Sequence, residues 1–159
     1  MHVDHTGALA HSVRPRASRA VGWILALLLS ACASGSRPTL QDDALFADLG
    51  GLQGVTAIVD GLLFAISEDP RIAHHFAESN ILRLREKLIE QLCAEAGGPC
   101  VYTGDSMQQS HAGRGYTQAD FNALVECLQQ SMQEQGVPFA AQNRLLARLA
   151  PMQRDILYR

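Results

Sequence analysis

The feature that most constrains the fold is an apolar stripe of helical period in the middle of the chain. Apolar side chains recur there at i, i+3, i+4, i+7, i+8 and i+11, which is the spacing of one helix face: Val55, Ile58, Val59, Leu62, Leu63 and Ile66. Asp69 and Pro70 follow, and the residue before a proline is driven out of the helical region. The stripe therefore predicts a long amphipathic helix that ends near Asp69.

The same period recurs later in the sequence, over residues 81–92, 121–132 and 145–156, and predicts three further helices, of which the last begins near Pro138. Thr117 and Asp120 resemble a capping box at the start of the third helix. Pro138 suits the first turn of the fourth helix, and Pro151 predicts a kink within it. The apolar residues are mostly Leu and Ala, and aromatic residues make up only 6%. These observations predict an all-α fold.

The segment between the second and third helices is long, irregular and rich in Gly, Ser and Thr. It runs from Gly97 to Tyr116 and holds one potential turn of helix, Ser106 to His111. Long irregular segments in compact domains are usually functional or disordered. By spacing alone, a surface histidine in a mobile loop is the favoured interpretation of His111, because a single histidine specifies no metal site.

The N-terminal segment is typical of an export signal. Three arginines precede a short apolar run, Val21–Leu29, which is too short to span a bilayer. Leu29-Ser30-Ala31-Cys32 resembles the bacterial lipobox, in which the cysteine is lipidated after cleavage; the alternative is an ordinary signal with a chance cysteine. Ala33 stands where lipoproteins of the inner membrane often carry Asp, so the periplasmic face of the outer membrane is the expected location.

This pattern divides the chain into a signal peptide, residues 1–31, a lipid-anchored flexible tether, residues 32–41, and a folded domain, residues 42–159. Once Cys32 is lipidated, one disulfide can form among Cys93, Cys100 and Cys127, and the sequence does not choose the pair. The formal net charge of -3 provides no basic excess for a phosphate backbone, so no nucleic-acid partner is expected.

Several glycine motifs and one histidine, in this order, resemble the truncated haemoglobins of group I. The matching pieces are Asp48-Leu49-Gly50-Gly51, Asp69-Pro70-Arg71, Phe76, Gly97-Gly98-Pro99, Tyr102-Thr103-Gly104, Met107, His111-Ala112-Gly113-Arg114-Gly115, Phe121 and Ala150-Pro151. The resemblance implies a truncated globin, a two-over-two helical sandwich around haem b.

By this resemblance, His111 is the proximal ligand of the haem iron. Phe76 matches the residue that packs on the haem face, and Met107 lies one helical turn before His111. Lys87 and Tyr102 match positions at the haem edge, where a cation or a hydroxyl could meet a propionate; plain surface roles are the alternative for both. For His74 and His75 we expect exposed or capping roles.

The distal side departs from the family pattern. Many group I members carry a Tyr where this chain has Leu63, and a Gln where it has Leu88. With Leu62 and Leu84 nearby, the sequence predicts a distal pocket without a hydrogen-bond donor. Gln91 follows on nearly the same stripe, and we expect it at the rim of the pocket or outside it.

Three functions remain open at this stage. The first is reversible binding of a diatomic gas (oxygen, carbon monoxide or nitric oxide) by a His-ligated haem. The second is an enzyme, either a nitric oxide dioxygenase or a weak peroxidase, which needs an electron donor that the sequence does not identify. The third is a globin-shaped lipoprotein that has lost haem and acts as an interaction module.

Overall fold

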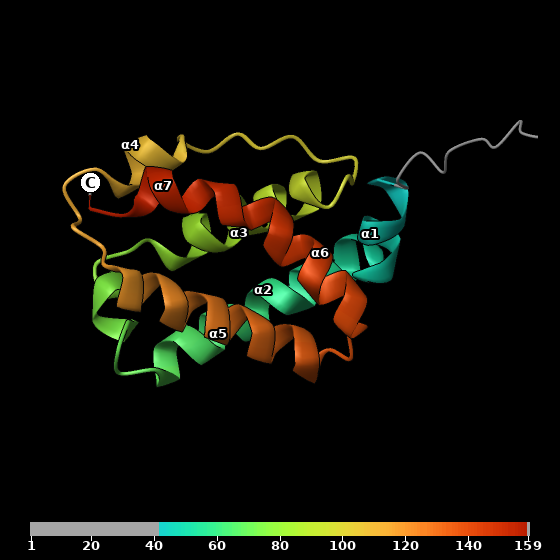
Figure 1. The fold of residues 1–159 in the computed structure, drawn as a ribbon, viewed down its shortest axis with the longest axis horizontal. Coiled ribbons are helices and arrows are strands. Elements are labelled where there is room, and N and C mark those ends of the chain that lie inside the picture. The colour runs from blue at the N-terminus through green and yellow to red at the C-terminus, as the bar shows by residue number, and fades with distance from the viewer. Residues whose placement is uncertain (1–41, 159) are drawn as a thin grey trace, which may run out of the picture. The chain divides into compact units, whose positions relative to one another are not determined.

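The computed structural model describes residues 42–158, and within that range the chain forms helices and turns but no strand (Figure 1). The predicted signal peptide, the tether and Cys32 lie outside the described residues. The first helix, α1, spans Asp42–Asp48 and contacts α2 and α6. No apolar stripe in the sequence predicted this helix.

The predicted central helix is α2, Gly51–Glu68, and it packs mainly against α5, Gln118–Glu134. All but one of the predicted stripe residues are buried, and the exception, Leu63, is half-buried. The two helices approach closely at Gly61, because an added Cβ there would lie 2.5 Å from Ser131 Oγ. Ser131 Oγ donates a hydrogen bond of 2.6 Å to the carbonyl of Ile58 across this crossing. Helix α2 is long and apolar enough to span a membrane, but its apolar stripe is buried in the core of this domain.

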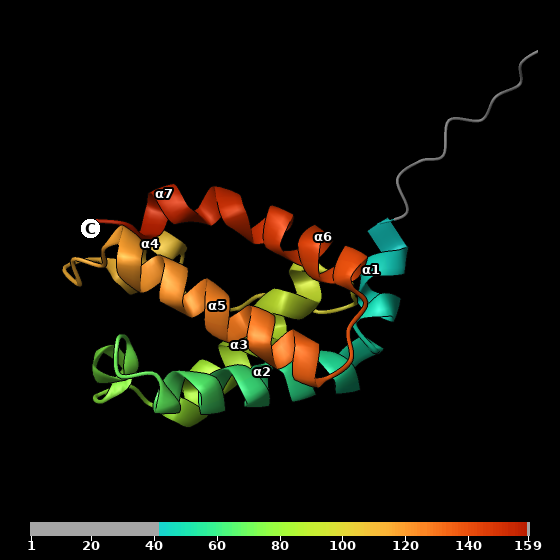
Figure 2. The ribbon, with the colours of Figure 1, turned by 60° about the horizontal axis from the view of Figure 1, so that its bottom comes forward.

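The remaining long helices complete two facing pairs. Helix α3 spans Ile81–Glu95, and its N-cap residue Asn80 accepts a hydrogen bond from the Arg83 amide. Helix α6 spans Phe139–Leu149 and contacts both α3 and α5. Helices α2 and α3 form one pair, and α5 and α6 form the other (Figure 2). This arrangement confirms the predicted all-α, two-over-two fold.

The C-terminal stripe is broken as Pro151 predicted. After α6 the chain passes through the 3-10 turn η2, Ala150–Met152, into the short helix α7, Gln153–Ile156. Helix α7 lies beside α4, Met107–His111, in the red and gold part of Figure 1. Gln108 Nε2 donates a hydrogen bond of 2.9 Å to Asp155 Oδ1 between them. The chain end therefore braces the one-turn helix that carries His111.

The structure also decides the cysteine pairing. Cys93 and Cys100 form a disulfide across the Gly97-Gly98-Pro99 turn, and their Cα atoms are 5.7 Å apart. Cys127 remains a free, buried thiol. The disulfide ties the end of α3 to the start of the irregular segment that leads to His111.

Candidate functional site

A cavity of about 660 Å³ lies between the helix pairs. This volume falls within the range of about 300–1,000 Å³ that is typical of small-molecule and cofactor sites. Every long helix, the 3-10 turn η1 (Ala73–Phe76) and α4 contribute to its wall. The apolar part of the wall includes Leu62, Ile66, Phe76, Leu84, Leu88, Phe121, Leu124, Leu128, Leu146 and Leu149.

His111 reaches this cavity from α4, and its local sequence fixes its tautomer. Ser106 and Gln109 form a reciprocal capping box that starts the one-turn helix. His111 Nδ1 lies 2.7 Å from the Met107 carbonyl and 2.9 Å from Ser110 Oγ. Since Ser110 Oγ donates to the Ser106 carbonyl, the network assigns the proton to Nδ1. The lone pair then resides on Nε2.

The environment of His111 suits a metal ligand in an apolar site. Burial lowers the pKa of the imidazole, while its hydrogen bond to the Met107 carbonyl acts in the opposite direction. The neutral form is the one that binds metals, and a hydrogen bond from the other ring nitrogen orients such ligands. The donor set and the apolar wall therefore fit a haem group.

Gln91 lines the cavity, so of the two expected positions, at the rim or outside, the second is excluded. Its Nε2 atom is 3.3 Å from Met152 Sδ and 3.6 Å from Met107 Sδ, so both thioethers contact the amide. Met152 belongs to η2, which is 61 residues away from Gln91 in the sequence; the two residues meet only because the fold places η2 beside α3. The amide of Gln91 is thus directed toward the α4 side of the cavity.

The predicted distal leucines separate into two groups. Leu62, Leu84 and Leu88 line the large cavity, but the structure places Leu63 in a neighbouring hollow of about 320 Å³. Phe76 contributes to the walls of both spaces. Consecutive residues point about 100° apart on a helix, so Leu62 and Leu63 face different spaces. The expectation for Leu63 is corrected accordingly.

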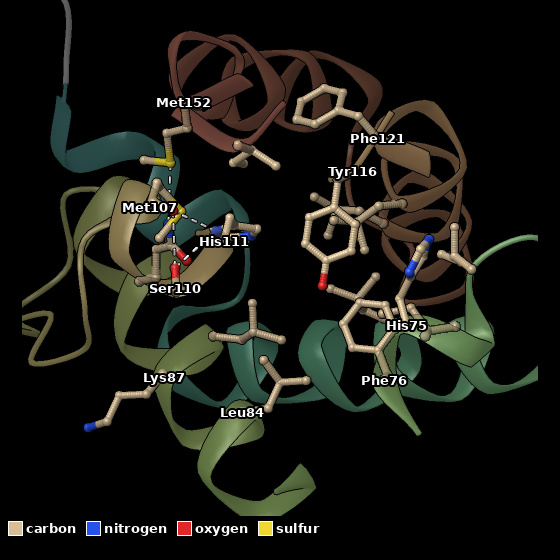
Figure 3. A pocket seen from close by; sticks show the side chains of 18 of the residues that line it. His75, Phe76, Leu84, Lys87, Met107, Ser110, His111, Tyr116, Phe121 and Met152 are labelled. Atoms are coloured by element: carbon tan, nitrogen blue, oxygen red, sulfur yellow. Dashed lines mark hydrogen bonds between the residues drawn. The ribbon is translucent and has the colours of Figure 1, made fainter. Parts of the chain in front are cut away.

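Lys87 and Tyr102 line the cavity edge, but protein groups hold their polar ends. Lys87 Nζ lies 2.8 Å from Glu90 Oε1 and 2.7 Å from Thr103 Oγ1, and it points away from the cavity in Figure 3. The Lys87 and Thr103 hydrogen bonds lower the pKa of Glu90 to about 2. Tyr102 donates its hydroxyl proton to the Asp105 carbonyl at 2.7 Å.

Two further residues line the cavity: Tyr116, for which the sequence suggested no role, and His75, for which it suggested an exposed or capping role. The Tyr116 ring meets the His111 ring edge-on at 5.6 Å and the His75 ring at 4.9 Å. His74 is exposed, whereas His75 is half-buried in the cavity wall, which corrects the expectation of an exposed or capping role for it. The closeness of Tyr116 to His111, five residues away, was the available signal.

The fold and this site together define a small haem-binding globin. The model of the family "Bacterial-like globin" matches residues 44–158, and the chain belongs to this family. Similar proteins include the "Group 1 truncated hemoglobin GlbN" of Nostoc commune, which is 30% identical over 113 residues, covering 71% of this chain and 96% of that protein. The truncated hemoglobin of Tetrahymena pyriformis in its Fe(III) form superposes with a TM-score of 0.70 and 25% identity, over 72% of this chain and 98% of that one.

The cofactor and the ligand class follow from this membership. Globins of this family bind haem, with its iron, and the family binds diatomic gases. Membership of this family therefore favours the haem-binding functions over the haem-free interaction module. The cavity has the size and the donor chemistry that this cofactor requires.

Proposed function

We propose that this protein binds a diatomic gas reversibly at a haem iron that His111 holds. The observation that carries the proposal is the His111 imidazole, which is neutral, oriented by the Met107 carbonyl and part of the wall of an apolar cavity. When bound, haem would supply the iron to which a diatomic gas coordinates. Oxygen, carbon monoxide and nitric oxide are the candidate ligands.

The other residues of the cavity wall provide apolar surface for the haem and for the gas. Phe76 and Phe121 provide flat apolar surface in the cavity wall, which favours a planar macrocycle over water. Leu62, Leu84 and Leu88 exclude water from the same space and offer no hydrogen bond. This lining favours ligands that carry little charge, so we expect carbon monoxide to be preferred strongly over oxygen.

The leucine lining gives the enzymatic alternatives no specific support. A peroxidase uses an acid–base side chain beside the reacting oxygen atoms, and leucines do not provide one. A nitric oxide dioxygenase requires repeated reduction, and its electron donor is not identified by this chain. Ligand binding is therefore the function that this geometry supports best.

His111→Ala in the haem-loaded protein tests the proposal, with His74→Ala as the matched control because His74 is exposed. We expect His111→Ala to lower haem retention and to abolish the ferrous spectrum of a five-coordinate, His-ligated haem. His74→Ala should change neither property. An unchanged spectrum in His111→Ala would show that another residue, with His75 the first candidate, binds the iron.

We further propose that Cys32 is lipidated and anchors the domain at the periplasmic face of the outer membrane. The support is the sequence before Cys32 together with the Cys93–Cys100 disulfide, because disulfides persist in exported proteins and are rare in the cytosol. The tether, residues 32–41, would then connect the lipid to α1.

A further inference from the structure

The backbone around His111 does little to fix the orientation of its side chain. Helix α4 has one turn, and the glycines that follow it, Gly113 and Gly115, adopt φ values of 73° and 66°. The hydrogen-bond partners of the imidazole, Met107 and Ser110, belong to the same short helix. A ring held at Nδ1 alone can still rotate about that contact, so its plane needs a second restraint.

Tyr116 provides this restraint from outside the helix. Its ring meets the His111 ring at an interplanar angle of 69°, an edge-on arrangement that aromatic pairs favour. The Tyr116 carbonyl accepts a hydrogen bond of 3.0 Å from the Tyr158 amide, which fixes the backbone at this point. Figure 3 shows the Tyr116 side chain extending into the cavity between His111 and Phe76.

The other side of the Tyr116 ring is supported by His75, which meets it at an interplanar angle of 84°. His75 Nε2 is shielded from solvent and lies 3.2 Å from Asp120 Oδ1, within ion-pair distance. Asp120 is itself fixed, because it accepts hydrogen bonds from the Thr117 amide and hydroxyl in the capping box of α5. These contacts lower the pKa of Asp120 to about 2, so it remains charged.

We propose that Tyr116, supported by His75 and Asp120, is a positioning residue that sets the plane of the His111 imidazole. The inference rests on the proposed role of His111 as the iron ligand. The contacts run from η1 and the start of α5 through Tyr116 to α4, and they join segments that the sequence separates. The ring makes the contact, so the hydroxyl of Tyr116 is dispensable for this role.

The test compares Tyr116→Leu and Tyr116→Phe in the full chain loaded with haem. Resonance Raman spectra of the ferrous protein report the iron–histidine stretching band, which responds to the orientation of the imidazole. We expect the band to shift and broaden in Tyr116→Leu and to keep its position and width in Tyr116→Phe. Loss of the aromatic pair should also speed haem dissociation about 2- to 12-fold in Tyr116→Leu.

Tyr116→Met fills the space with a flexible apolar side chain and replaces Tyr116→Leu if that variant does not fold. A band at the unmodified position and width in the leucine or methionine variant would overturn the proposal, and so would an equal shift in Tyr116→Phe. Failure of the proposed function has a different signature. In that case the band would persist in His111→Ala, whatever the Tyr116 variants show.

Discussion

Replacement of Leu88 by Gln tests whether the leucine lining controls oxygen release. Leu88 lies on α3, is half-buried and lines the large cavity. Oxygen gains partial negative charge when it binds ferrous haem, so it accepts a hydrogen bond where a donor is available. Leu88→Gln supplies an amide donor in a space that Leu62 and Leu84 otherwise keep apolar, and we expect oxygen to leave more slowly.

The magnitude follows from the net value of one hydrogen bond. A protein hydrogen bond contributes about 0.5–1.5 kcal/mol, and each 1.4 kcal/mol changes an equilibrium constant about tenfold. Oxygen release should therefore slow about 2- to 12-fold in Leu88→Gln. Carbon monoxide carries less charge when bound, so its release should change less. Leu88→Met, which has similar volume and no donor, should leave oxygen release close to that of the unmodified protein.

Stopped-flow measurement of oxygen and carbon monoxide dissociation in the three proteins is the assay. Slow oxygen release from the unmodified protein would refute the reasoning, because it would reveal a donor already present in the pocket. Gln91 would then be the first candidate, since it lines the cavity and its amide contacts two thioethers, which are weak acceptors. Equal slowing by Leu88→Met would assign the effect to packing.

Four further outcomes are expected. Cys93→Ser should lower the free energy of unfolding by about 2.5 kcal/mol relative to the oxidised unmodified protein, because the short disulfide loop is lost, and urea denaturation measures this difference; the reduced unmodified protein should match the variant. Glu90→Gln should destabilise the protein at neutral pH, because the pKa of Glu90 in the folded protein, about 2, lies below its usual value of 4.5. The difference in the free energy of unfolding between the two proteins should be full above pH 4.5 and vanish as the pH falls to about 2. Acid titrations followed by circular dichroism measure it. Leu62→Tyr should slow oxygen release more than Leu63→Tyr, since only Leu62 lines the large cavity; the reverse order in stopped flow would contradict the assignment of the two leucines. Cys32→Ser should abolish incorporation of a labelled fatty acid, and label retained in that variant would exclude the lipobox.

The helices were predictable because their signals are local. The spacing of apolar residues between positions 55 and 66 requires only the geometry of one helix, and α2 follows it closely. The capping box of Thr117 and Asp120 and the break at Pro151 also act within a few residues, and both are present. Helix α1 and the turn η1 were not predicted, because segments of four to seven residues hold too few apolar positions to reveal a period.

The sequence by itself determined the helical fold, the family resemblance and the candidate ligand His111, since short-range periodicity and ordered motifs carry that information. The tertiary structure decided which side chains meet. It chose Cys93 and Cys100 as the disulfide pair, turned Gln91 toward two thioethers and directed Leu63 away from the large cavity. It also brought Tyr116 against His111. These contacts depend on how helices cross and how far each is rotated, and that is fixed by packing among residues far apart in the chain.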